Sequence, residues 1–133
     1  MKLRAVREAN VVRLTVSGGD AIDSTNAAEV KAEALRLVGA APDVVVDLSG
    51  VEFVDSAGVA VLVGLFKNAR GLGGHARFCG LTPGVRAVLE LIQLDRIFEI
   101  YDDVDAAMRS CGEINAAPRV VEGRKPPETP RSG

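Results

Sequence analysis

An aspartate and a serine at the start of a predicted helix are the residues best placed for chemistry. Asp55 and Ser56 lie between an apolar strand, residues 44–46, and a helix that is apolar over residues 59–66. Both residue types are common N-caps, so capping alone explains Ser56. The other explanation is phosphorylation, because a phosphate at a helix N-terminus meets free N–H groups and the positive end of the helix dipole. The residues alone favour capping.

Further carboxylates follow two of the predicted strands. They are Asp20, Asp23, Asp47, Glu52 and Asp55. Loops that follow parallel strands tend to meet at one edge of a sheet, so we expect these acids to share a surface around Ser56. A metal site is one use for such a surface, but capping explains Asp23 and Asp55 equally well, and the ligand spacing is sparse. We therefore expect no metal and no cofactor.

The remaining reactive side chains do not indicate an enzyme. His75 lies in a Gly-Gly-His-Ala turn, where a solvent-exposed loop residue is the simplest interpretation. Cys79 lies in an apolar strand and is expected to be an inert core residue. Cys111 lies near the end of the fold, and no CxxC spacing indicates a disulfide framework or a zinc site.

Composition is typical of one globular domain. The 133 residues are 47% hydrophobic and 26% charged, with a formal net charge of −2. Residues 1–117 carry 12 basic and 16 acidic side chains, and this acidic body argues against nucleic-acid binding. No apolar run approaches the roughly 20 residues of a membrane span, and no leader pattern opens the chain. We expect a cytoplasmic protein.

The elements that position Asp55 and Ser56 can be read from periodicity and capping. Residues 2–7 and 11–17 alternate like an antiparallel hairpin with one wet face. A helix is expected from Asp23 or Ser24 to about Val38, followed by the buried strand and the helix beginning at or just after Ser56.

The second half of the chain repeats the strand and helix pattern. Residues 76–80 predict a second internal strand, and Thr82-Pro83 predicts a helix start with a buried stripe that includes Ile92. A strand over residues 97–100 and a helix capped by Asp102 or Asp103 and running through Met108 complete the pattern.

These elements predict an α/β fold in a single domain. We expect a mixed four- to five-stranded sheet with an N-terminal hairpin and about four helices packed against it. The domain should occupy residues 1–115. Residues 116–133 contain four of the six prolines among charged and small residues, and they are expected to form a flexible Pro-rich tail.

Three motifs resemble those of STAS-domain proteins of the anti-sigma factor antagonist type, over about residues 5–112. The most specific is VVVDLSGVEFVDSAGVAVLVGL, in which an apolar strand leads through Asp-Ser to a helix. The others are Ile22-Asp23 with Asn26-Ala27, and the Leu81-Thr82-Pro83-Gly84-Val85 helix start. The resemblance implies a STAS-like fold and a switch that is not an enzyme.

The resemblance also implies partners and site residues. The unphosphorylated protein is expected to bind an anti-sigma factor serine kinase and so free the sigma factor; phosphorylation of Ser56 releases the kinase, and a serine phosphatase resets the switch. The residues implied in partner binding are Asp23, Asp55, Ser56, Ala57 and Gly58. Ala57 replaces a second hydroxyl residue of the family motif. An accessory subunit of an ABC-type lipid transport complex is therefore the alternative.

Overall fold

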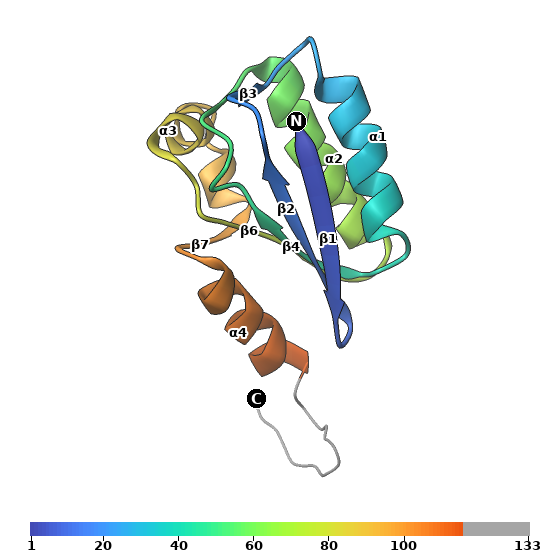
Figure 1. Cartoon of the computed structure of the whole chain (residues 1–133). Coiled ribbons are helices and arrows are strands. Elements are labelled where there is room, and N and C mark those ends of the chain that lie inside the picture. Colours follow the sequence, from blue (N-terminus) through green and yellow to red (C-terminus); the bar gives the residue numbers. More distant parts are fainter. Residues whose placement is uncertain (116–133) are drawn as a thin grey trace.

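The computed structural model of the chain describes residues 1–115, with side chains described to residue 111 (Figure 1). Its strands are β1 (Lys2–Glu8), β2 (Val11–Ser17), β3 (Ala21–Ile22), β4 (Asp43–Asp47), β5 (Phe53–Val54), β6 (Ala76–Cys79) and β7 (Glu99–Tyr101). Its helices are α1 (Ala27–Val38), α2 (Ser56–Gly71), α3 (Pro83–Leu91), the 3-10 helix η1 (Leu94–Arg96) and α4 (Val104–Asn115).

The main sheet has five strands in the order β1-β2-β4-β6-β7. The hairpin β1–β2 is antiparallel, and every later pair in this sheet is parallel. The hairpin therefore lies at one side of the sheet with β4 at its centre, which confirms the predicted mixed sheet and the place of the buried strand.

Helices cover both faces of the central strand. Val44 and Val46 join a core that includes residues of α1, α2 and α3, whereas Val45 packs with Ala107 and Cys111 of α4. Figure 1 shows α1 and α2 side by side on one side of the sheet and α4 on the other. Three consecutive valines suit this strand because its side chains alternate between two apolar layers.

Three of the four predicted starts of helices are confirmed, including that of α4 after Asp103, and one is wrong. Thr82 caps α3, and α2 begins at Ser56. The first helix begins at Ala27, not after Asp23 or Ser24, because the Asp23 carboxylate accepts hydrogen bonds from the N–H and hydroxyl of Thr25 and so stabilises a turn.

The C-terminal elements are shifted from their predicted positions. The last strand covers Glu99–Tyr101 because η1 comes first and Phe98 N–H donates to the carbonyl of Leu94, 2.9 Å away. Helix α4 is capped by Asp103 as expected, but it continues past Met108 to Asn115. The predicted buried stripe of α3 fails at Ile92, which is 46% exposed.

Two short strands were not predicted. β3 and β5 pair in parallel as a separate two-stranded ladder, with Ala21 opposite Phe53 and Ile22 opposite Val54.

Within the described residues, no helix has both the length and the apolar character needed to cross a membrane. The predicted tail at residues 116–133 lies outside the described residues.

Candidate functional site

Asp55 ties together the two loops that form the candidate site. Its backbone is extended, and its Oδ1 atom accepts a hydrogen bond from Gly58 N–H at 3.0 Å, which caps α2. Its Oδ2 atom accepts from the N–H of Ser24 at 3.1 Å, which fixes the loop before α1. Both oxygens are therefore engaged by backbone donors, and the carboxylate does not orient the Ser56 hydroxyl as a general base would.

Ser56 is the first residue of α2 and is exposed. Asp55 supplies the cap, so the structure does not support the capping explanation for Ser56. Within the described part of the chain, the Ser56 hydroxyl has no hydrogen-bond partner. The position offers an outward-facing hydroxyl beside a helix N-terminus, where N–H groups without helical acceptors favour an added anion.

The two residues after Ser56, Ala57 and Gly58, pack against the rest of the protein. A Cβ at position 58 would lie 2.1 Å from the carbonyl oxygen of Ile22 and 3.0 Å from the Cβ of Val54, so only glycine allows β3 to pack this closely on α2. Gly58 is buried, and Ala57 is half-buried against the core. Direct contact of either residue with a partner stays a prediction.

Asp23 lies in the neighbouring loop, and its carboxylate has a lowered pKa. The hydrogen bond from the Thr25 hydroxyl, followed by that from the Thr25 N–H, lowers the pKa of Asp23 below its ordinary value of 3.8. Because Asp55 holds Ser24 by its N–H, the loop with Asp23 lies beside the start of α2. The structure thus brings Asp23, Asp55 and Ser56 to one surface, as expected from the sequence.

The five acids do not all share that surface. Glu52 and Asp20 lie near it, since Glu52 N–H donates to the carbonyl of Asp20 at 2.8 Å. Asp47 instead lines a separate pocket of about 340 Å³ with Asp102, Asp103 and Asp105 at the start of α4. In the described residues, no group of three or more His, Cys, Asp or Glu side chains could hold a metal ion.

His75 has a partner that the sequence did not reveal. Its Nδ1 atom lies 3.0 Å from Oε2 of Glu99 on β7, and the side chain is 46% exposed. Pairing between β6 and β7 sets this contact, and sequence spacing could not show it. The imidazole forms a surface ion pair when protonated and lies away from Ser56.

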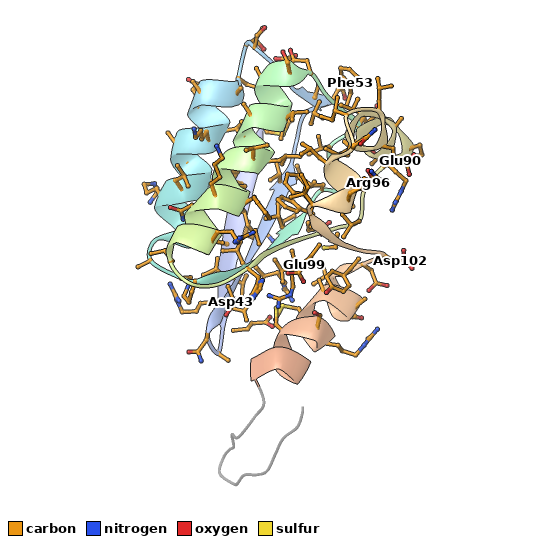
Figure 2. All side chains as sticks on the ribbon, turned by 180° about the vertical axis from the view of Figure 1, so that it is seen from behind. Asp43, Phe53, Glu90, Arg96, Glu99 and Asp102 are labelled. Carbon is orange, nitrogen blue, oxygen red and sulfur yellow. The ribbon has the colours of Figure 1, made fainter. Side chains whose placement is uncertain are left out.

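Arg77 was missed entirely by sequence reasoning. It is fully buried on β6, where Nη1 lies 3.4 Å from Asp43 and Nε lies 3.4 Å from Glu99 and 3.3 Å from the hydroxyl of Ser110. Figure 2 shows Asp43 and Glu99 on the side of the sheet where α4 lies, and Ser110 is in the second half of that helix. Arg77 and its partners thus link β4, β6 and β7 to α4. Because Arg77 lies beneath that helix, we assign it a structural role.

The cysteines are buried, as expected for Cys79. Burial raises the pKa of the Cys79 thiol to about 12 and also raises the pKa of Cys111. Thiols with raised pKa values are poor nucleophiles at neutral pH. The site around Ser56 therefore has no nucleophile paired with a base among the described residues. What it can offer is a surface for binding and a hydroxyl for modification by another protein.

Comparison with known proteins agrees with this geometry. The sequence profile of the STAS domain matches residues 2–107. An anti-sigma F factor antagonist of Paenibacillus polymyxa is 33% identical over 60 residues, which are 45% of this chain and 51% of that protein. The chain thus matches about half the length of this curated relative.

Solved structures extend the similarity to most of the fold. A STAS-domain anti-sigma factor antagonist protein from Planctomyces limnophilus superposes with a TM-score of 0.74 at 25% identity, covering 81% of this chain and 96% of that one. An anti-sigma factor antagonist from Mycobacterium paratuberculosis gives a TM-score of 0.70 at 26% identity, covering 82% and 92%. The chain belongs to the STAS domain family.

Proposed function

We propose that this STAS-domain protein is a cytoplasmic anti-sigma factor antagonist, whose unphosphorylated form binds an anti-sigma factor serine kinase. Phosphorylation of Ser56 by that kinase releases the complex, and a serine phosphatase restores the hydroxyl. The activity of the protein is binding, not catalysis. The names of its relatives support this proposal.

The observation that carries the proposal is that Asp55, and not Ser56, caps α2. Because Asp55 caps α2 through Gly58 N–H, the Ser56 hydroxyl is left exposed and without a structural duty. A phosphate on Ser56 would add about 1.5 to 2 negative charges beside Asp55 and Asp23. The fold need not break, since the N–H groups of Ser56 and Ala57 have no acceptor within α2 and the positive end of the helix dipole lies here, but the surface seen by a partner changes sharply.

The size of the switch follows from the same charge. If the phosphate leaves an unpaired charge in the contact, a loss of about 2 to 5 kcal/mol weakens binding by about thirty-fold to several thousand-fold. We therefore expect Ser56→Ala to retain kinase binding and Ser56→Asp to weaken it. Binding is measured by calorimetry with the purified kinase. Asn10→Asp is the matched control, because it adds the same charge at the exposed turn between β1 and β2 and should not change the affinity.

Incubation with the kinase and ATP tests the modification directly. Mass spectrometry should locate one phosphate on Ser56 in the wild type and none in Ser56→Ala. Phosphate on another residue, or equal affinities for the alanine and aspartate variants, would remove Ser56 from the mechanism. Co-purification of an ABC ATPase in place of a kinase would support the transport alternative.

A further inference from the structure

Exposed apolar side chains concentrate at one turn of the molecule. Within the described residues, the large hydrophobic side chains that are exposed are Val6, Phe53, Leu72, Leu91, Ile92 and Ile97. Three of them surround the turn between α3 and β7: Leu91 is 82% exposed, Ile97 57% and Ile92 46%. We call these three residues the α3 ridge. Single exposed hydrophobic residues are ordinary, whereas three of them within seven positions at one turn make this turn a candidate contact surface.

The α3 ridge is held firmly. Ile92 N–H donates to the carbonyl of Val88 at 3.2 Å, and Ile97 N–H donates to the carbonyl of Leu94 at 3.0 Å. Phe98 is buried and stacks on Phe78 with ring centroids 4.6 Å apart, which anchors the end of the turn in the core. The exposed side chains therefore project from a fixed backbone, and binding them requires little ordering of the turn.

Helix α3 is joined to the segment that carries Ser56. The Thr82 hydroxyl donates to the carbonyl of Val51 at 2.7 Å, and a Cβ on Gly84 would lie 2.2 Å from the carbonyl oxygen of Glu52. Phe53 follows on β5, three positions before Ser56, and is 48% exposed. Figure 2 shows Phe53 near the end of the molecule where α2 begins. Phe53 thus lies against the start of α3, on the segment that leads to Ser56.

The area of these side chains indicates what covers them. Phe53 and the α3 ridge together expose a few hundred Å² of apolar surface, whereas a stable interface buries roughly 800 Å² on each partner. The patch is too small to hold two copies of this chain together. It suits the apolar part of a larger contact that also includes the polar surface at Ser56, since interfaces combine an apolar centre with a polar rim.

Resting on the proposed function, we infer that Phe53 and the α3 ridge form the apolar half of the surface that docks the anti-sigma factor kinase. The two halves have different tasks. The ridge contributes affinity that does not depend on the state of Ser56, and the serine contributes the charge that ends the complex. Loss of the ridge should weaken binding before and after phosphorylation alike.

The test uses the full chain and neutral substitutions. Leu91→Gln with Ile97→Gln removes apolar surface without adding charge, and glutamine is well tolerated at Leu91, the last residue of α3. The matched control is Leu72→Gln, because Leu72 is 43% exposed at the far end of α2, about 24 Å along the helix from Ser56. The probes are the purified ATP-dependent anti-sigma factor kinases of the same genome, tested one at a time. Thermal melts of each variant check that it is folded.

We expect the double variant to raise the Kd for the kinase by about 10- to 100-fold, and the Leu72 control to stay within about twofold. With the protein as phosphorylation substrate, KM should rise by the same factor while kcat is unchanged, because the ridge does not touch the reacting hydroxyl. Phospho-Ser56 protein should lose affinity further in the double variant.

Each other outcome overturns the inference in a distinguishable way. Wild-type affinity in the double variant, with Ser56→Asp still weakening binding, refutes the ridge and leaves the proposed function intact. Failure of the wild type to bind any of the kinases refutes both. A wild-type dimer that the double variant dissociates, seen by sedimentation, assigns the ridge to a second copy of the chain.

Discussion

The glycine two positions after Ser56 shows how one missing methyl group shapes the site. The backbone of β3 approaches Gly58 so closely that any Cβ would overlap the carbonyl oxygen of Ile22. Neither group is the end of a flexible side chain, so relief requires movement of β3 or α2. The requirement for glycine is therefore steric and does not depend on an unusual backbone angle.

We expect Gly58→Ala to lower the free energy of unfolding by about 3 kcal/mol, because the alanine methyl forces two backbone segments apart. Urea unfolding measures the change. Gly71→Ala on the same helix is the control: nothing lies within 4 Å of its added Cβ, so it should be neutral or stabilise by up to about 1 kcal/mol. Equal effects of the two substitutions would contradict the role assigned to Gly58.

The hydrogen bonds from Thr25 predict how Asp23 titrates. Its pKa is lowered in the folded protein, so the charged form contributes stability above the unfolded-state pKa, and this is lost as pH falls through the folded-state pKa. Thr25→Val keeps the side-chain shape but removes the hydroxyl donor, so the pKa of Asp23 should rise toward 3.8. NMR titration of the Asp23 carboxyl carbon measures this. Ser24→Ala should leave the midpoint unchanged; an unchanged midpoint in Thr25→Val would refute the assignment.

Among the elements, β6 carries a fully buried charged side chain. This is Arg77, which lies beneath α4 between the carboxylates of Asp43 and Glu99. Removal of a buried cation leaves its partner charge uncompensated, so we expect Arg77→Met to cost about 3 kcal/mol of stability. Adding Asp43→Asn should recover about 1 kcal/mol or more, measured as the coupling in a double-mutant cycle.

An exposed ion pair provides the comparison for Arg77. Nη2 of Arg36 lies 2.7 Å from Oε2 of Glu33 on the surface of α1. Arg36→Met should lower the free energy of unfolding by less than about 1 kcal/mol because solvent screens the pair. A similar cost for Arg36→Met and Arg77→Met would show that burial does not set the value of the Arg77 group.

The elements that sequence predicted well are those with local signals. Thr82-Pro83 starts α3, since cap and proline act within one turn, and three adjacent valines indicate a strand covered on both faces. The pair β3–β5 was not predicted, because strands of two residues have no periodicity and form through contact across 32 positions. The predicted start of α1 was wrong because the Asp23 side chain can either cap a helix or stabilise a turn. In the structure it stabilises a turn with Thr25.

The candidate site was predicted in outline. Its Asp-Ser motif and the neighbouring Asp23 could be read from the sequence. The identity of the cap, the separate position of Asp47 and the burial of Arg77 could not, because each depends on which strands become neighbours. Exposure of Ile92 depends on the turn after α3, which periodicity does not describe.

At the scale of the whole molecule, we propose that residues 1–115 are the complete folding unit. The composition of residues 116–133, rich in proline and charged residues, provides little apolar surface to bury. A chain ending at Asn115 should therefore unfold within about 0.5 kcal/mol of the full chain, measured in urea. A larger loss would place residues 116–133 within the folding unit.

The separate β3–β5 ladder has a consequence for how the segment with Ser56 opens. The loops around Ser56 lie outside the five-stranded sheet, and the two residue pairs of this ladder, the carboxylate of Asp55 and the bonds to Asp20 hold them. Small units of this kind open at a lower free energy than the whole protein. The N–H groups of Ser24 and Gly58 should therefore exchange with deuterium well before those of β4. If Ser56 is the substrate of a kinase, as proposed, sub-global opening of this kind would let its segment enter the active site of the kinase while the core remains folded.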